Sequence, residues 1–501
     1  MKRKNRIITS LVLLSMLLSS LVSCSEKETE TESNANVGTK DTETSGAVTL
    51  GDDTTEADGA EAYFAKTFDG ITLGGGDFMF LTMFSSSPLK DYVRFDHEGI
   101  TGEPVDDAIY NQVVTVEDKL DVNIDYYASA NVRSEIMNAV KSGDTTYKAV
   151  EDHNTIIANL VISNYLTDLN NIEYINFDNP WWNENYKEKL TVAGKTYLAF
   201  GDIFFEAGIK NVHLFYFNKE MCDSYNIEYP YQAVYDGKWT MDYIMNLVGG
   251  VSKDLNGDGM MDRNDRWGLV QSPIQSSIIY YTSGFGTMSY DEDGYPYLDM
   301  WSDAFVNFYE KLFALDYKTE GVWTNTQADE SANFQMFVDG KVLLCSDFLS
   351  NASRVREVEF DVGILPYPKY DENADYVNWP TGGNHLMGVP SVIDSDEYDF
   401  VGIVLEALSV TGYEYVRPAL YEVTLQGKLA RDRESQDMLD LIFDTMSIDF
   451  GWIHTGDSGM GWFVNSCLSA KLANISSFYK RTETRAAKYY NKIVDYYRAM
   501  D

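Results

Sequence analysis

Residues 122 to 153 read VNIDYYASANVRSEIMNAVKSGDTTYKAVEDH, and they contain the signals of a strand, a helix and a second strand. Apolar and polar residues alternate over 122 to 126, which is the period of a strand with one buried face. Residues 133 to 141 have helical spacing and stop at Gly143, a residue that commonly ends helices. Residues 147 to 153 then read as the second strand. This order predicts a sheet with helices packed on its faces.

The same alternation continues on both sides of this stretch. Residues 71 to 84 read as a strand interrupted by glycines, and residues 107 to 120 read as a helix. The apolar residues of that helix share one face: Ile109, Val113, Val116 and Leu120. An apolar helix over residues 155 to 166 follows the second strand. The pattern predicts the α/β class, with a parallel or mixed sheet between layers of helices.

The composition bounds the class of protein. The chain has 501 residues, of which 44% are hydrophobic and 14% aromatic. That length suits two or three domains, or one large body of two lobes, and the composition can fill their cores. The formal charge of −39 excludes nucleic acid and anionic lipid as the main partner, because both bind basic surfaces. Five histidines leave little material for histidine-based chemistry.

The N-terminus predicts where the protein resides. Four cationic residues lie within the first six positions, and residues 7 to 23 are apolar and small. Leu21-Val22-Ser23-Cys24 resembles a bacterial lipobox. We therefore expect residues 1 to 23 to be a lipoprotein signal peptide and Cys24 to carry lipid, which anchors the chain on the extracytoplasmic face of the cell membrane. An ordinary cleaved signal peptide is the alternative.

Residues 24 to 62 have the composition of a disordered acidic tether. Glu, Thr, Asp, Ser, Gly and Ala dominate this range, and large apolar side chains are almost absent. Such a segment buries too little apolar surface to fold, and its charge extends it by self-repulsion.

The remaining cysteines are Cys222, Cys345 and Cys467, which are far apart in the sequence. An odd number of thiols allows at most one disulfide bond, and a chain of this length requires none. We expect three buried free thiols.

Residues 254 to 265, DLNGDGMMDRND, have the spacing of a calcium loop. Such a loop supplies oxygens from positions 1, 3, 5, 7, 9 and 12, with glycine at position 6, which is Gly259 here. The expected Ca²⁺ ligands are Asp254, Asn256, Asp258, the backbone carbonyl of Met260, Asp262 and Asp265. Because position 12 is Asp rather than Glu, we expect a structural site rather than a sensor. A solvated turn without metal is the alternative.

Several short motifs recur in an order that is typical of one family. After the lipobox come the turn Ser142-Gly143-Asp144, the segment Gly194-Lys-Thr-Tyr197 and the triplet Phe217-Asn-Lys219. Others follow at 237 to 240, 267 to 270, 337 to 344, 362 to 368 and 382 to 390. Over about residues 63 to 501 the chain resembles bacterial extracellular solute-binding proteins of carbohydrate-type ABC transporters, of the family 1 kind. Each motif alone is degenerate, and their shared order carries the resemblance.

The resemblance implies a two-lobed periplasmic-binding-protein-like fold with a hinge and a cleft between the lobes. Lobe one would comprise 63 to 205 plus 380 to 425, and lobe two 206 to 379 plus 426 to 501. Crossings between them would fall near 201 to 209, near 378 to 390 and near Leu425. Gly382 and Gly383 suit a hinge, although an ordinary turn explains either. The implied function is capture of a sugar or oligosaccharide for delivery to an ABC permease, without catalysis.

A sugar site needs an aromatic plate for the C–H face and short polar side chains for the hydroxyl groups. Motif position places Asp152, His153 and Asn154 on one side of the cleft, Asp347 and Phe348 opposite, and Trp462 as a stacking ring. Trp379 and Trp452 are further candidates for the cleft. Each of these residues could instead be packing, and packing is the interpretation we favour for Trp181, Trp182 and Trp239.

Other functions are compatible with parts of the sequence. Gly456-Asp-Ser-Gly459 resembles the nucleophile loop of trypsin-like proteases, but no histidine lies in a matching motif. A surface glycoside hydrolase needs only two carboxylates across a cleft, and 78 acidic residues leave that reading open. A peptide-binding protein and a scaffolding lipoprotein are the remaining alternatives.

Overall fold

The computed structural model describes residues 56–84, 99–326, 330–380, 384–424 and 433–500, and these described residues belong to one compact unit. The signal peptide, Cys24, Gly382, Gly383 and the crossing near Leu425 lie outside the described residues. Residues 56 to 62, predicted as the end of the tether, instead form the first part of α2 (Glu56–Thr67). The helix forms because Ala60 and Phe64 are buried in the core.

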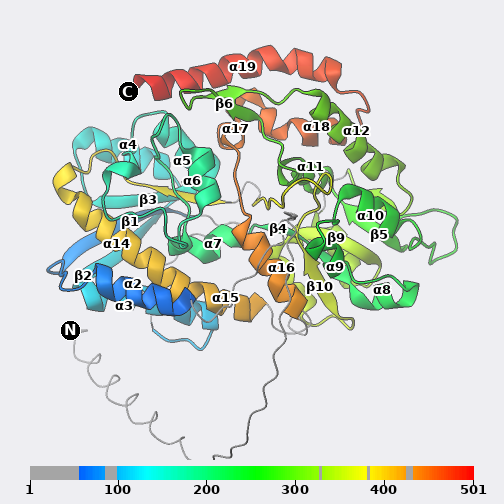
Figure 1. The fold of residues 1–501 in the computed structure, drawn as a ribbon, viewed down its shortest axis with the longest axis horizontal. Coiled ribbons are helices and arrows are strands. Elements are labelled where there is room, and N and C mark those ends of the chain that lie inside the picture. Colours follow the sequence, from blue (N-terminus) through cyan, green and yellow to red (C-terminus); the bar gives the residue numbers. More distant parts are fainter. Residues whose placement is uncertain (1–55, 85–98, 327–329, 381–383, 425–432, 501) are drawn as a thin grey trace, which may run out of the picture. The chain divides into compact units, whose positions relative to one another are not determined.

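The first sheet has the strand order β11-β3-β1-β2. Strands β1 (Gly76–Met83), β2 (Val122–Ser129) and β3 (Tyr147–His153) are parallel, and β11 (His385–Gly388) pairs antiparallel with β3. Its helices include α3 (Pro104–Leu120), α4 (Val132–Ser142), α5 (Asn154–Val161) and α14 (Tyr398–Thr411). In Figure 1, α4 and α5 lie on one side of the strands, and α3 and α14 on the other.

Local sequence explains where these helices end. Helix α4 stops at Gly143, which adopts a positive φ of 70° that side chains disfavour. Helix α5 ends at Val161, earlier than the expected limit at residue 166, because the chain turns at Asn164 with φ 57°. Alternating side chains of β1 serve two cores: Phe78 and Phe80 pack with α3 and α14, and Leu81 and Met83 with α4 and α5.

The second sheet has the order β10-β4-β9-β5-β8. Strand β5 (Trp267–Gln271) is parallel to β8 (Val322–Thr324) and β9 (Val342–Phe348), whereas β4 (His213–Asn218) is antiparallel to β9 and β10 (Val362–Leu365). All strands of the first sheet fall in the ranges predicted for lobe one, and all strands of the second in those predicted for lobe two. The lobe boundaries stay predictions.

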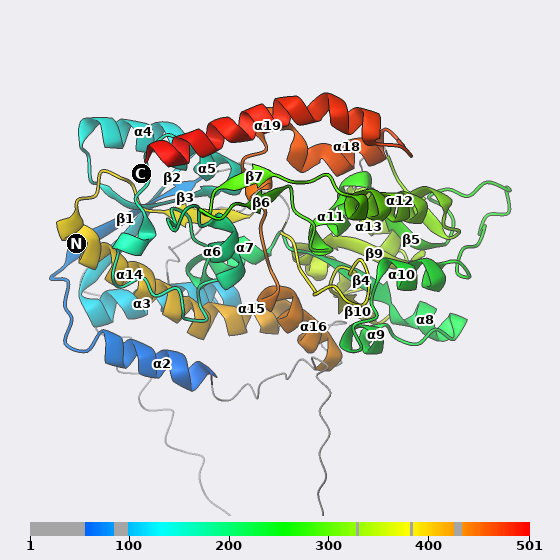
Figure 2. The same cartoon turned by 45° about the horizontal axis from the view of Figure 1, so that its top comes forward.

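The remaining elements connect and cover the sheets. The helices are α6 (Glu184–Leu190), α7 (Phe205–Ile209), α8 (Lys219–Tyr225), α9 (Tyr231–Tyr235), α10 (Met241–Val248), α11 (Pro273–Thr282), α12 (Asp303–Lys318), α13 (Glu330–Val338), α15 (Arg417–Thr424), α16 (Arg433–Asp444), α17 (Phe450–Ile453), α18 (Phe463–Ser469) and α19 (Ser476–Ala499). Strands β6 (Met288–Tyr290) and β7 (Pro296–Leu298) form a hairpin beneath α19 (Figure 2).

Short 3₁₀ or π turns join several of these elements. They are η1 (Leu169–Asn171), η2 (Asp202–Phe204), η3 (Leu349–Val355), η4 (Ser395–Glu397), η5 (Gly412–Val416), η6 (Gly456–Ser458) and η7 (Met460–Trp462). The segment Gly194 to Gly201, which begins with the Gly194-Lys-Thr-Tyr197 motif, makes isolated bridges, among them Ala199 with Met387 of β11.

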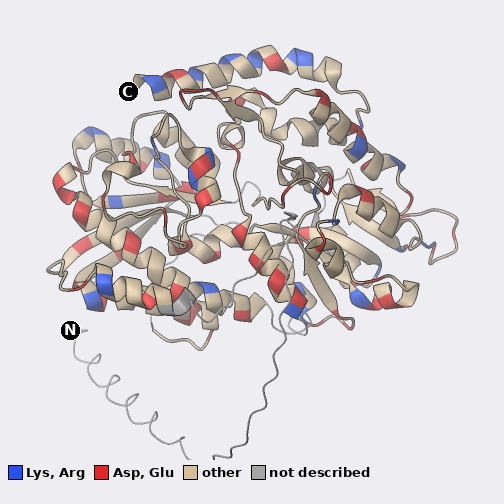
Figure 3. Cartoon of the chain, in the orientation of Figure 1, with Lys and Arg blue, Asp and Glu red and all other residues tan. Residues whose placement is uncertain are grey.

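The structure shows where the charged residues lie and the state of the cysteines. Acidic residues occur on many elements of the described chain, whereas basic residues recur along α19 (Figure 3). Cys222, Cys345 and Cys467 are buried free thiols, which confirms that expectation. Burial raises the pKa of the Cys222 and Cys467 thiols to about 12. Among the described helices, none combines the length and the apolar character that a bilayer crossing requires.

Glu406 of α14 organises the core around the first sheet. Its fully buried carboxylate accepts hydrogen bonds from the ring N–H groups of Trp181 (2.9 Å) and Trp182 (2.7 Å), the amide of Asn179 (2.7 Å) and the hydroxyl of Tyr63 (3.0 Å). Both tryptophans are thus packing residues, as predicted. Trp239 is fully buried too, and Thr240 caps the helix that follows it.

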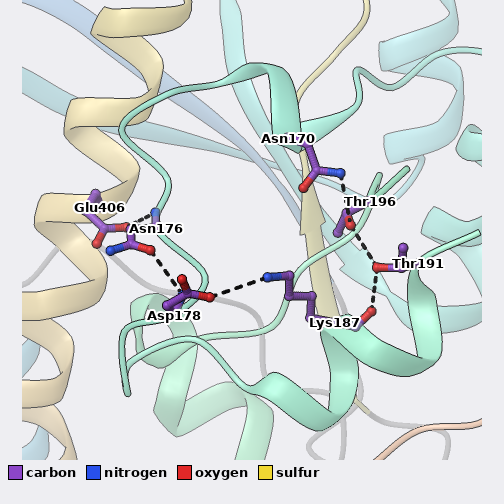
Figure 4. A network of polar contacts seen from close by, with 7 residues as sticks. All are labelled: Asn170, Asn176, Asp178, Lys187, Thr191, Thr196 and Glu406. Atoms are coloured by element: carbon purple, nitrogen blue, oxygen red, sulfur yellow. Dashed lines mark hydrogen bonds and ion pairs between the residues drawn. The ribbon is translucent and has the colours of Figure 1, made fainter. Parts of the chain in front are cut away.

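The Glu406 contacts continue into a polar network along the same loop. The backbone N–H of Asn176 donates to Glu406 (3.2 Å), and the Asn176 side chain accepts from the backbone of Asp178 (3.2 Å). Lys187 of α6 lies 3.8 Å from the Asp178 carboxylate, so the loop is tied to α6 (Figure 4).

We expect Glu406→Gln to lower the free energy of unfolding by about 2 kcal/mol. The amide loses one acceptor oxygen, and buried donors left without partners cost about 1–3 kcal/mol. Urea denaturation at pH 7 measures the effect, with the exposed Glu422→Gln as the matched control, which should stay within about 0.5 kcal/mol of the parent. An equal, small effect of both substitutions would contradict the role of Glu406.

Candidate ligand-binding site

Three of the tryptophans selected from the sequence come together around Tyr281 of α11. The Tyr281 ring stacks on Trp379 with centroids 4.2 Å apart and planes 13° apart. Trp452 of α17 meets both rings edge-on, at 5.5 Å and 5.9 Å, and Trp462 lies 4.7 Å from Trp452. Trp379 and Trp452 are buried, whereas Trp462 is 37% exposed. The cluster therefore extends from the core to the surface.

Backbone contacts fix the positions of these rings. The main chain of Asn378 pairs with Thr445 and Ser447, which holds the neighbouring Trp379. Asp449 accepts the backbone N–H of Trp452 (2.8 Å) and that of Thr287 (2.9 Å), so the short helix α17 is anchored to the start of β6. Burial raises the pKa of Asp449, and the hydrogen bonds from Thr287 act in the opposite direction.

Two ring N–H groups of the cluster have no acceptor. The Nε1 atoms of Trp379 and Trp452 are buried and make no hydrogen bond. Other tryptophans in the chain do find acceptors: Trp239 donates to the carbonyl of Pro366 (2.9 Å). A buried donor without a partner costs about 1–3 kcal/mol, so two in one cluster point to a missing partner.

The carboxyl end of β3 supplies polar groups from the first sheet. Asp152 and Asn154 are buried, and both amide atoms of Asn154 make no hydrogen bond. The Asn154 backbone N–H donates to the carbonyl of Asn384 (2.9 Å), whose own side-chain oxygen has no donor. His153 pairs its ring with the Thr155 hydroxyl at 3.1 Å.

Helix α5, which begins at Asn154, packs against α17, which carries Trp452. Polar groups from the first sheet and rings beside the second sheet therefore belong to neighbouring elements. Taken together, the unpartnered donors and acceptors are those of Trp379, Trp452, Asn154 and Asn384. We name these four residues, with Tyr281 and Trp462, the tryptophan site.

Asp347 and Phe348 lie at the end of β9, opposite the start of β4. The Asp347 carboxylate accepts from the Asn351 amide (2.8 Å), and the Phe348 ring lies 4.2 Å from His213. Burial lowers the pKa of His213 to about 3, so this imidazole is neutral at physiological pH. These contacts of Asp347 and Phe348 are local to the second sheet, and the role of the two residues in binding stays a prediction.

Sequence reasoning missed Tyr281 and Asn384. Tyr281 follows Tyr280 in a helix with the appearance of core packing, and nothing in its spacing marks it as part of a site. Asn384 follows the glycine pair that was interpreted as a hinge. The Gly456-Asp-Ser-Gly459 motif is a turn in which the buried Ser458 hydroxyl donates to the carbonyl of Thr455 and lies 3.0 Å from the Tyr490 hydroxyl.

The predicted calcium loop folds back on its first and last acidic residues. Asp254 accepts the backbone N–H groups of Gly257 (2.6 Å) and Gly259 (2.9 Å), and both glycines have positive φ. Asp265 accepts those of Leu255 (2.9 Å) and Asp262 (2.8 Å), and these bonds lower its pKa. Over the described ranges, no three His, Cys, Asp or Glu side chains gather as a metal site would require. Calcium binding remains a prediction.

Comparison with family models and with curated proteins gives no match. Solved structures do match. MalE from Xanthomonas citri, a sugar-binding protein, has a TM-score of 0.57 at 10% identity, covering 83% of this chain and 98% of its own. UspC of M. tuberculosis gives 0.53 at 11%, covering 82% and 100%, and a cyclo/maltodextrin-binding protein complexed with maltotetraose gives 0.50 at 12%, covering 84% and 96%.

These likenesses define the class of fold. The chain has the two-lobed α/β fold of MalE-like binding proteins, which confirms the fold predicted from the sequence. The neighbours are similar in architecture at identities too low to transfer residues. The tryptophan site therefore rests on the geometry of this chain alone.

Two buried asparagines allow a direct test of the missing partners. We expect Asn154→Leu to leave the unfolding free energy of the ligand-free protein unchanged, because its amide makes no hydrogen bond to lose. Asn218→Leu should lower it by about 1 kcal/mol, since Asn218 is equally buried and caps α8 through the Met221 N–H (2.8 Å). Urea denaturation of both variants measures the difference. A larger loss for Asn154→Leu would show that its amide is already bonded.

Proposed function

We propose that the protein captures a sugar or oligosaccharide between its two lobes at the tryptophan site. The observation that carries the proposal is the set of buried, unpartnered hydrogen-bonding atoms of Asn154, Trp379 and Trp452 beside stacked aromatic rings. A sugar hydroxyl both donates and accepts, so it can satisfy an indole N–H and an amide together. The exposed Trp462 offers a plate for the C–H face of a ring.

Capture works by closure rather than by chemistry. A solute that contacts Asn154 on one lobe and the tryptophans on the other stabilises the closed arrangement over the open one. No covalent step is needed, and the protein acts as a binder, not an enzyme. Burial of the site excludes water, which makes each hydrogen bond to the solute stronger.

The predicted location of the protein implies how the solute is delivered. The lipid on Cys24 holds the protein at the extracytoplasmic face of the membrane, and the acidic tether gives the folded body reach. The closed form then hands the solute to the transmembrane subunits of an ABC permease. The binding of sugars by the structural neighbours supports the solute class.

Thermal unfolding against a panel of oligosaccharides, monosaccharides and peptides tests this function. A ligand at about a hundred times its dissociation constant adds about 2.7 kcal/mol of stability, which is several degrees in melting temperature. We expect one class of sugar to give this shift and Asn154→Leu to abolish it without changing the unliganded melting temperature. A shift with peptides alone would favour the peptide alternative.

The same ligand distinguishes a binder from a glycoside hydrolase. The oligosaccharide that shifts the melting temperature is incubated with the protein, and the products are separated by chromatography. We expect the full amount to be recovered intact. Release of shorter products that Asn154→Leu eliminates would replace the binding function with hydrolysis.

We further propose that residues 254 to 265 bind Ca²⁺ as a structural ion. Asp254, Asn256 and Asp258 are partly or fully exposed, and each keeps acceptor capacity beyond its bonds to the loop backbone. Glycines at 257 and 259 allow the tight turn that such a loop needs. The ion would fix the loop between α10 and β5 without contacting the solute.

We expect Ca²⁺ to raise the melting temperature of the parent protein and Asp258→Ala to abolish that increase. In chelator the variant and the parent should melt together, and solute selectivity should be the same in both. Glu292→Ala, on an exposed turn outside the loop, is the control and should keep the full response to calcium. Equal melting of the parent with and without chelator would refute the calcium site.

A further inference from the structure

A cavity lies along the outer edge of the second sheet. It has a volume of about 670 Å³ and is bounded by β8, the end of α12, the first turns of α13 and one side of residues 262 to 263. Strand β8 is the last strand of its sheet, so this cavity is separate from the tryptophan site, which adjoins α5, α11 and α17. Trp323, Asn333, Arg263 and Lys471 all line it.

Trp323 provides a rigid aromatic wall. Its ring stacks on Trp267 of β5, with centroids 5.7 Å apart and planes 27° apart. Trp267 is itself fixed, because its ring N–H donates to the carbonyl of Asp262 (2.8 Å). A supported ring that lines a cavity is the apolar surface that a pyranose C–H face requires.

The free polar groups of this cavity are donors. The Nδ2 atom of Asn333 is buried without a partner, although the Oδ1 atom of the same amide accepts from Asn325 (3.0 Å). Arg263 and Lys471 are exposed, and neither forms an ion pair within the described part of the chain; the Lys471 ammonium lies 5.4 Å from the Tyr317 ring. In a chain of formal charge −39, two unpaired cations at one cavity are unusual.

Of the two carboxyl groups of the lining, Asp316 is satisfied by the protein, and Asp262 belongs to the loop at 254 to 265. Asp316 accepts from Gln271 (2.6 Å) and from Ser276 (2.9 Å to each oxygen), and its burial raises its pKa to about 7. Asp262 accepts the backbone N–H of Asn264 at 2.7 Å. The positive groups left for a ligand are Arg263 and Lys471, and the Asn333 amide adds a buried donor.

We propose that this cavity is a second carbohydrate site, and that it takes an acidic saccharide, a pyranose carrying a carboxylate. The ring packs on Trp323, the carboxylate lies between Arg263 and Lys471, and the Asn333 amide donates to a ring hydroxyl. The site needs no lobe closure, because every group belongs to one lobe. It acts beside the proposed capture site and does not depend on it.

Isothermal titration of the mature chain with digalacturonate tests the site, with the dimethyl ester of the same disaccharide as the neutral control. We expect the acid to bind at least tenfold more tightly than the ester, and the double variant Arg263→Gln/Lys471→Gln to weaken the acid at least tenfold. Lys480→Gln/Arg481→Gln, two exposed cations on α19 outside the cavity, should bind the acid as the parent does.

Each outcome decides the proposal. A separate acidic-sugar site is supported if the Arg263/Lys471 variant loses binding of digalacturonate while Asn154→Leu binds it with the affinity of the parent. Loss in Asn154→Leu alone would place the acid in the tryptophan site and overturn the second site while keeping the capture function. Three other results would also overturn the second site. They are equal affinity for the acid and the ester, unchanged affinity for the acid in the Arg263/Lys471 variant, and no heat of binding with either ligand.

Discussion

The carboxylate of Glu406 is the interaction on which the arrangement of the first lobe depends. Five donors from two separate stretches of chain converge on it: the Tyr63 hydroxyl of α2, and four side-chain or backbone groups from residues 176 to 182. A carboxylate in this setting is costly to bury, as its raised pKa shows, and the donors offset that cost. The loop it holds leads directly into α6.

Buried polar groups in this protein divide into satisfied and unsatisfied sets. Glu406, Asp316 and Asp449 are surrounded by donors, and each fixes one region of backbone. Asn154, Asn384, Trp379 and Trp452 have lone donors or acceptors where helices of the two sheets meet. Buried groups without partners are uncommon in folded proteins, so those that neighbouring elements share support a binding site better than residue type does.

Much of the architecture was predictable because its signals are local. The period of residues 122 to 126 and the glycine at 143 each act within one turn of chain, and the structure has a strand that begins at Val122 and a helix that ends before Gly143. Trp462, chosen by motif position, and the further candidates Trp379 and Trp452 lie in one cluster of rings. The identity of the unsatisfied atoms was not predictable, because whether an amide such as Asn154 is bonded depends on partners from distant segments.

Errors in the sequence analysis have the same origin. Residues 56 to 62 look too polar to fold alone, yet they extend a helix whose Phe64 is buried by elements formed far along the chain. In the sequence of its helix, Tyr281 resembles a core residue. Only its stacking on Trp379 shows that it belongs to the tryptophan site. Tertiary contacts override local composition in both cases.

The loop at residues 254 to 265 connects two features that are distant in the sequence. Its two ends pair through the backbones of Lys253 and Arg266, and the carbonyl of Asp262 holds the ring of Trp267. Trp267 in turn supports Trp323, which forms a wall of the cavity at the outer edge of the second sheet. The loop and that wall are therefore connected through the contacts of Asp262 with Trp267 and of Trp267 with Trp323. The loop is best understood as the support of the edge of the second sheet, and the cavity as the surface which that support makes available.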